Sequence, residues 1–278
     1  MFKPRALKAL CGLVMALFCQ AAVSEALVPL NHLPALAGDY FKLASEELNR
    51  PLHIYVRLPE GYADDDGVYP IVYLLDGDSL FPILAANHLF LSYDDKLPEA
   101  VVVGIAYGSF DPKINRRGYD FSPPGSNTNP DRGGAEAFQR FLKQELLPKV
   151  EQRYRVDPTR RVLFGQSRGG SFVLYSAFTE PDLFWGRIAS NPSLEPGREL
   201  FYGLPADAER DDLRLVLTSG TQDRLELRAQ AEEWSQHWLS AEAAPWAVKR
   251  IDIESGTHAA DSPASYRAAM RWLFGLDS

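Results

Sequence analysis

Apolar residues along the chain follow two alternating patterns. Short runs rich in valine, isoleucine, leucine and phenylalanine predict strands at residues 40–45, 52–58, 71–75, 101–105, 161–164, 187–190, 213–219 and 247–253. Between them, apolar residues at helical spacing predict helices at residues 80–91, 134–154, 167–179, 225–241 and 263–274. Several of the strands are almost continuously apolar, which is typical of a sheet covered on both faces. We therefore expect an α/β fold, in which helices cover both faces of a mostly parallel sheet that begins with an antiparallel pair of strands.

The first 26 residues differ from the rest of the chain. Lys3, Arg5 and Lys8 precede an apolar run over residues 9–18, and small residues follow at 21–26. This order is typical of a secretory signal peptide, and the run is shorter than the roughly 20 residues that span a bilayer. We therefore expect residues 1–26 to be a signal peptide and residues 27–278 to be a periplasmic or secreted domain without a stable membrane anchor. An apolar helix in the core is the alternative.

Composition narrows the possible partners and cofactors. The chain has 278 residues and a formal net charge of −8, which argues against nucleic acid as a partner. Both cysteines, Cys11 and Cys19, lie in the predicted signal peptide, so the mature domain would have no disulfide and no thiolate ligand. The chain also lacks a His-Glu-x-x-His motif and a glycine-rich nucleotide loop. We expect no metal and no cofactor, whereas the oligomeric state is not predicted.

Residues 165–170 carry the strongest chemical signal. Gly165-Gln166-Ser167-Arg168-Gly169 is a Gly-x-Ser-x-Gly motif between a predicted strand and a predicted helix. At such a junction the serine occupies a sharp, strained turn that exposes its hydroxyl at the edge of the sheet, and the two glycines leave room for the turn. Ser167 is therefore the candidate nucleophile.

A serine nucleophile needs a base and a carboxylate that orients the base. His258 lies in a loop after the last predicted strand, and Asp223 follows the strand at 213–219. The order Ser167, Asp223, His258 is that of an α/β-hydrolase triad. Glu226 is a rival for the acid and Asp261 a weaker one. The other four histidines, by their positions, favour structural roles; they are His32, His53, His88 and His237.

A tetrahedral intermediate also needs two N–H donors. The backbone of Arg168, directly after the serine, is one candidate. The second is expected in the loop after the strand at 71–75, where Gly77 would let the backbone turn inward and Asp78 would offer its N–H. An ordinary helix start, with Asp78 or Ser79 as N-cap, is the alternative and is compatible with that role.

One long segment breaks the alternation of strands and helices. Residues 106–133 contain several prolines and glycines and leave the carboxyl end of the strand at 101–105, the edge at which such folds bind their ligands. Arg116 and Arg117 in this segment are candidates for binding polar or charged parts of a substrate. Ion pairs with Asp111 or Asp120 are the alternative.

These residues together resemble the Putative esterase family of α/β-hydrolases, and within it bacterial hydrolases that include periplasmic siderophore (catecholate trilactone) esterases. The resemblance extends from about residue 40 to 274, and its motifs are Tyr73-Leu74-Leu75-Asp76-Gly77-Asp78, Val103-Gly104-Ile105, Arg116-Arg117-Gly118-Tyr119-Asp120-Phe121-Ser122-Pro123, residues 138–154 and 165–170, Asn191-Pro192-Ser193 and the loops at 220–223 and 258. It implies Ser167 as nucleophile, Asp223 as acid, His258 as base, and oxyanion donors near Gly77, Asp78 and Arg168.

The chain departs from the family pattern at two places. Gln166 and Arg168 flank the serine where the family usually has histidine and an aliphatic residue or tyrosine. Asn191 stands where serine is usual, and we assign it to substrate binding. Arg168 could meet an anionic acyl group or a catecholate, or pair with Asp78 or Glu195. Because of these departures, the resemblance does not identify the substrate, although it still indicates the type of reaction.

The sequence therefore predicts a secreted or periplasmic serine ester hydrolase. It would act through an acyl-enzyme on a small carboxylic ester, with siderophore-type esters among the candidates. An acyltransferase with the same triad and a non-catalytic ligand-binding protein are the alternatives.

Overall fold

The computed structural model describes residues 33–124, 132–195, 197–241 and 244–276. The predicted signal peptide and His32 lie outside these residues. The strands are β1 (Gly38–Ser45), β2 (Arg50–Arg57), β3 (Tyr69–Leu74), β4 (Val101–Ala106), β5 (Val156–Gln166), β6 (Gly186–Ser190), β7 (Arg214–Gly220) and β8 (Ala247–Ile253). All eight predicted strands are confirmed; β5 begins five residues before its predicted start, and the ends of the others shift by at most two residues.

The eight strands form one sheet in the order β1-β2-β4-β3-β5-β6-β7-β8. β1 pairs antiparallel with β2, and β2 pairs antiparallel with β4, whereas every pair from β4 to β8 is parallel. The predicted α/β fold with a mostly parallel sheet is therefore confirmed.

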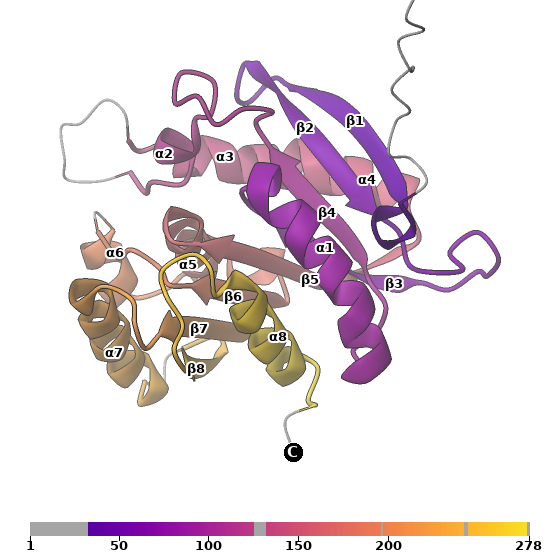
Figure 1. Ribbon diagram of the computed structural model, residues 1–278. Helices are drawn as coiled ribbons and strands as arrows, with labels where there is room; N and C mark the ends of the chain where they lie inside the picture. The colour runs from indigo at the N-terminus through magenta and orange to yellow at the C-terminus, as the bar shows by residue number, and fades with distance from the viewer. Residues whose placement is uncertain (1–32, 125–131, 196, 242–243, 277–278) are drawn as a thin grey trace, which may run out of the picture. The chain divides into compact units, whose positions relative to one another are not determined.

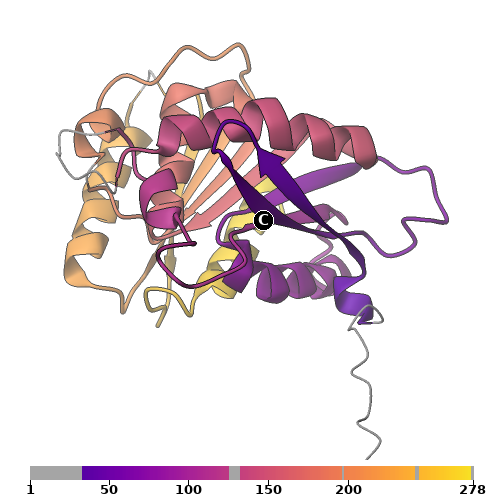
Figure 2. The ribbon, with the colours of Figure 1, turned by 90° about the horizontal axis from the view of Figure 1, so that it is seen from above.

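Helices cover both faces of this sheet. They are α1 (Gly77–Asp94), α2 (Arg117–Asp120), α3 (Ala135–Phe141), α4 (Leu147–Arg153), α5 (Arg168–Thr179), α6 (Arg198–Tyr202), α7 (Leu225–Leu239) and α8 (Ser262–Leu273). Figure 2 shows the sheet between α1 and α8 on one side and the helix pair α3–α4 on the other.

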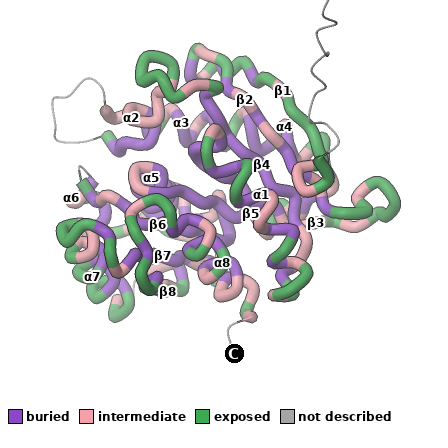
Figure 3. The backbone as a smooth tube through the Cα atoms, viewed as in Figure 1, coloured by how far each residue is buried: buried purple, intermediate pink, exposed green. Residues whose placement is uncertain are grey.

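The side chains of β3 show how the core is divided between the two faces. Ile71 and Tyr73 belong to the cluster under α3, α4 and α5, whereas Val72 and Leu74 belong to the cluster under α1 and α8. Successive side chains of a strand point to opposite faces, so an apolar run fills both layers. The central strands are accordingly coloured largely as buried in Figure 3.

The helix predicted at residues 134–154 is present over residues 135–153, with one irregular turn inside it. A π-helical turn over Leu142–Leu146 separates α3 from α4. Pro148, the second residue of α4, has no N–H to donate, so the regular hydrogen-bond ladder is interrupted there. The short helices α2 and α6 were not predicted, because four or five residues carry too little periodicity to be recognised.

Among the residues that the structure describes, no helix has the length and apolarity needed to cross a membrane.

Candidate active site

Ser167 occupies a strained turn between β5 and α5. Its φ and ψ angles are 59° and −114°, a combination that a non-glycine residue adopts only where the surroundings hold it. Gly165 is required here because a Cβ at this position would lie 2.3 Å from the carbonyl oxygen of Gly169. The Ser167 N–H donates to the carbonyl of Ser190 on β6 over 2.8 Å. The sharp turn predicted from the motif is therefore present, and it raises the serine above the end of the sheet.

His258 connects this serine to a buried carboxylate. Its Nε2 lies 2.9 Å from the Ser167 Oγ, and its Nδ1 lies 2.9 Å and 3.1 Å from the two carboxylate oxygens of Asp223. The three residues follow β5, β7 and β8, which end at the same edge because they are parallel. The contacts give a serine–histidine–aspartate arrangement of the kind that activates a hydroxyl for nucleophilic attack.

The geometry distinguishes between the candidates for the acid. Asp223 is buried and its carboxylate also accepts the N–H of Arg224 over 2.6 Å. Glu226 is exposed in the first turn of α7. Asp261 is buried but receives the side-chain amide of Asn191, not the imidazole. Of the three, Asp223 is the carboxylate that contacts His258.

Asn191 and Gln166 hold the loop that carries His258. The buried Asn191 amide donates to the His258 carbonyl over 3.1 Å and to Asp261, and its side-chain oxygen accepts the N–H of Gly220. The Gln166 side chain also donates to the His258 carbonyl. Asn191 does not line the cavities beside Ser167, so its substrate contact stays a prediction, while its observed contacts position the histidine. The sequence singled out Gln166 only as a departure from the family pattern.

The two candidate oxyanion donors lie at helix starts. Arg168 is the first residue of α5 and Asp78 the second of α1. Neither backbone N–H donates to a described residue, and helix N-termini favour a developing negative charge. The arrangement suits an oxyanion, and this role stays a prediction.

The turn before α1 differs from the expected one. The left-handed residue is Asp76, with φ 54°, and it is also the N-cap, so Asp78 and Ser79 are not N-caps. Gly77 serves another purpose: a Cβ there would lie 2.8 Å from backbone atoms of Gly104 and Ile105. The glycine therefore allows the start of α1 to pack closely against β4.

The arginines near Ser167 form contacts that differ from the ion pairs considered from the sequence. Arg117 pairs with Asp76, at 2.5 Å and 2.8 Å, and Arg116 lies over the ring of Tyr119. Asp120 is taken by Arg50 and Tyr107, and the Asp78 carboxylate accepts the N–H groups of Tyr107 and Gly108. The ion pairs weighed for Arg116 and Arg117 with Asp111 or Asp120, and for Arg168 with Asp78 or Glu195, are absent among the described residues.

Ser167 lines two cavities, which also share Phe110, Asn115 and Arg117. One, of about 720 Å³, is bounded by α2 and the start of α5 and is lined by Arg116, Arg117 and Arg168 among others. The other, of about 410 Å³, is lined by Asp78, Leu80, Ile83 and His258 among others. The Ser167 hydroxyl is therefore bordered by open space in which a substrate can be accommodated.

The remaining histidines in the described part of the chain have structural partners. His88 is buried between the Tyr266 hydroxyl and the Pro98 carbonyl, His53 contacts the Tyr40 hydroxyl, and His237 packs on aromatic rings. Within the same residues, no cluster of three or more histidine, cysteine or acidic side chains is arranged to hold a metal ion.

Comparison with known protein families identifies the family of this chain. The model of the family described as "Putative esterase" matches residues 45–270. The chain belongs to this family, which is of the α/β-hydrolase type. Among curated members of known name, it is 31% identical to the ferri-bacillibactin esterase BesA of Bacillus subtilis over 214 residues, which are 71% of each chain. It is 32% identical to the apo-salmochelin esterase of Escherichia coli over 53% of this chain and 48% of that one.

Solved structures agree with the family assignment. The BES protein of Bacillus cereus superposes with a TM-score of 0.74 and 26% identity, over 84% of this chain and 94% of that one. The enterobactin hydrolase IroE in complex with DFP gives a TM-score of 0.69 at 24% identity, over 85% and 94% of the two chains, which is a likeness of fold. Membership in the Putative esterase family supports hydrolysis of esters as the class of reaction.

Proposed function

We propose that this chain is a secreted or periplasmic serine hydrolase that cleaves a small carboxylic ester through an acyl-enzyme intermediate. The observation that carries the proposal is the contact of 2.9 Å between His258 Nε2 and the Ser167 Oγ, with Asp223 on the opposite ring nitrogen. Without a neighbouring base a serine hydroxyl is a weak nucleophile, and this contact supplies the base. The export of the protein rests on the composition of residues 1–26.

The roles of the residues follow from their positions. Ser167 attacks the ester carbonyl while His258 takes the hydroxyl proton and Asp223 stabilises the resulting imidazolium. The N–H groups of Arg168 and Asp78 receive the oxyanion. His258 then protonates the leaving alcohol, and in the second half of the cycle it activates a water molecule that releases the acid.

The substrate that the site favours is a siderophore-type ester. BesA and the apo-salmochelin esterase are named for such substrates, and the former is 31% identical to this chain. The cavities of about 720 Å³ and 410 Å³ that Ser167 lines provide room for a bulky ester.

The proposal is tested with 4-nitrophenyl butyrate and a fluorophosphonate probe. We expect Ser167→Ala to lower kcat by about 10⁴-fold or more and to abolish labelling, with an unchanged melting transition. Ser193→Ala is the matched control, because the Ser193 hydroxyl donates to the Glu195 carbonyl and not to a triad residue. This variant should retain both ester hydrolysis and labelling by the probe. Turnover that persists in Ser167→Ala would overturn the proposal.

The same assays separate the alternatives. A wild-type protein that binds esters but is neither labelled nor active would be a ligand-binding protein. Product analysis with a competing alcohol would reveal an acyltransferase, in which the alcohol replaces water at deacylation.

A further inference from the structure

The imidazole of His258 has a second neighbour besides Ser167. The Nη2 of Arg224 lies 3.1 Å from His258 Nε2, and the Nε of the same guanidinium lies 4.0 Å from the Asp223 Oδ1. The backbone N–H of Arg224 donates to that oxygen over 2.6 Å. Arg224 directly follows Asp223 and is the N-cap residue of α7, so its side chain starts beside the triad.

The partners of the imidazole indicate where its proton lies. The Asp223 carboxylate only accepts hydrogen bonds, so the His258 Nδ1 that faces it carries the proton. In the neutral ring Nε2 then has one lone pair, and two donors approach it: the Ser167 hydroxyl at 2.9 Å and the Arg224 guanidinium at 3.1 Å. Because a guanidinium has donors and no acceptor, its contact with Nε2 is compatible only with the neutral imidazole.

The same contact disfavours the imidazolium. Once Nε2 carries a proton, an N–H of Arg224 faces the N–H of His258, and two positive charges lie side by side. When His258 takes the proton of the Ser167 hydroxyl, the guanidinium must therefore turn away, and it keeps all its own protons. The side chain can do so because it is 66% exposed. Among the residues that the structure describes, its guanidinium contacts only Asp223 and His258.

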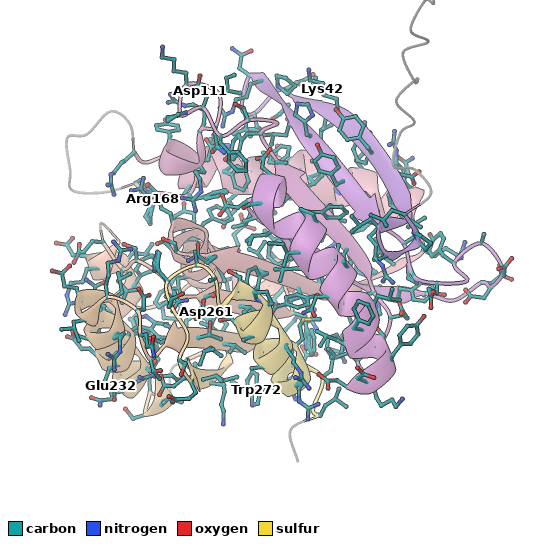
Figure 4. All side chains as sticks on the ribbon, viewed as in Figure 1. Lys42, Asp111, Arg168, Glu232, Asp261 and Trp272 are labelled. Atoms are coloured by element: carbon teal, nitrogen blue, oxygen red, sulfur yellow. The ribbon has the colours of Figure 1, made fainter. Side chains whose placement is uncertain are left out.

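Other charged groups face His258 from the elements around it. Asp223 comes from the loop after β7, and Asp261 is the N-cap residue of α8, at the position that Figure 4 labels. The smaller cavity, which His258 lines, is also lined by Asp76, Asp78 and Arg117. All these groups stay in place when Arg224 is replaced, so a difference between the variant and the wild type reports the guanidinium.

We propose that Arg224 is a positioning residue for the catalytic base: its guanidinium holds the His258 imidazole neutral, with Nε2 toward Ser167, and withdraws when the imidazolium forms. The inference rests on the proposed function and adds a residue that acts through His258 and not on the substrate. Two effects of opposite sign follow. Without the guanidinium the imidazolium forms at a higher pH, so activity is lost on the acid side. At alkaline pH the Ser167 hydroxyl has the Nε2 lone pair to itself, so activity is kept.

The pH profile of kcat/KM tests this role, because kcat/KM reports the protonation of the free enzyme. Hydrolysis of 4-nitrophenyl butyrate is followed at a wavelength where 4-nitrophenol and its anion absorb equally. At about pH 8 Arg224→Gln should keep at least about half of the wild-type kcat/KM. At about pH 5.5 the ratio of variant to wild type should be about 2- to 10-fold lower than at pH 8. Arg224→Lys keeps the charge but not the planar fork, so it should lose less.

A second charge variant is the matched control. Lys249→Gln removes one positive charge from an exposed position on β8, and Lys249 lines neither cavity at Ser167. It should follow the wild type at both pH values. A ratio of Arg224→Gln to wild type that is the same at both pH values would overturn the proposal, because a residue that only supports the start of α7 lowers activity uniformly.

A titration without substrate separates this proposal from the proposed function. In protein with ¹³C-labelled histidine, the Cε1 resonance of His258, assigned by its absence from His258→Gln, follows the protonation of the ring. In Arg224→Gln its titration curve should lie about half to one pH unit above that of the wild type. If no ester is hydrolysed, the proposed function fails and this curve still tests the contact. Coincident curves would overturn the role of Arg224 even in an active hydrolase.

Discussion

The guanidinium of Arg117 donates two hydrogen bonds to the carboxylate of Asp76, over 2.5 Å and 2.8 Å. Asp76 is the left-handed residue before α1, and Arg117 is the first residue of α2, so the pair connects two segments separated by 41 positions. The same guanidinium reaches the carbonyl of Gln166, next to Ser167, at 3.5 Å. One side chain therefore ties the proposed oxyanion loop to the turn of the nucleophile.

Arg117→Gln is expected to loosen this connection. Because the guanidinium contacts the segments that carry both proposed oxyanion donors, its loss should lower kcat by roughly 10- to 100-fold with a smaller effect on KM. Arg117→Lys keeps the charge but not the two parallel hydrogen bonds, so it should restore only part of kcat. Steady-state kinetics with 4-nitrophenyl butyrate provide the measurement. A change confined to KM would mean that Arg117 contacts substrate instead of positioning the loop.

A pair of substitutions tests which carboxylate orients the His258 imidazole. In Asp223→Asn the side-chain NH₂ group cannot accept a hydrogen bond from the His258 Nδ1–H. The imidazole is then held in the wrong tautomer, so kcat should fall by about 10³- to 10⁴-fold. Glu226→Gln is the matched control, since Glu226 is exposed and its loss should change kcat less than about 2-fold. The rates of ester hydrolysis at neutral pH decide the matter; the reverse pattern would assign the acid to Glu226.

The sequence predicted the strands and the triad for the same reason. Parallel strands buried on both faces are continuous apolar runs, and the residues after their carboxyl ends meet at one edge. Ser167, Asp223 and His258 could therefore be grouped without coordinates. Side-chain pairing across the fold could not, because it depends on which groups packing brings together. Arg117 pairs with Asp76 and not with its neighbour Asp120, which lies buried against Arg50 of β2.

A side chain at Gly77 is expected to destabilise the fold. In Gly77→Ala the new Cβ would lie 2.8 Å from backbone atoms of β4, which cannot move without disturbing the central sheet. We expect a loss of about 2–4 kcal/mol in the free energy of unfolding. Gly67→Ala is the control, because its nearest neighbours are the side chains of Asp65 and Tyr69, which can move. Urea denaturation measures both, and equal stabilities would show that β4 yields at this point.

His88 makes the stability of the fold depend on pH. It is fully buried, its Nδ1 is 2.9 Å from the Tyr266 hydroxyl and its Nε2 is 3.1 Å from the Pro98 carbonyl. Burial, followed by the positive charge of Arg57, lowers the pKa of His88 from 6.5 to about 4. Between these values the unfolded chain binds the proton and the folded one does not, so acidification favours unfolding. The contribution of His88 is complete above pH 6.5 and is lost as the pH falls to about 4.

The lowered pKa corresponds to about 3 kcal/mol of stability over that range. Glutamine in place of His88 can hydrogen-bond to Tyr266 and Pro98 but does not titrate. His88→Gln should therefore lose about 2–3 kcal/mol less than the wild type when the pH falls from about 7.5 to about 4.5, measured by urea denaturation. His237→Gln, at an exposed position on α7, should follow the wild-type curve. If His88→Gln also follows that curve, His88 takes up its proton within the folded protein, and the acid sensitivity of the fold has another source.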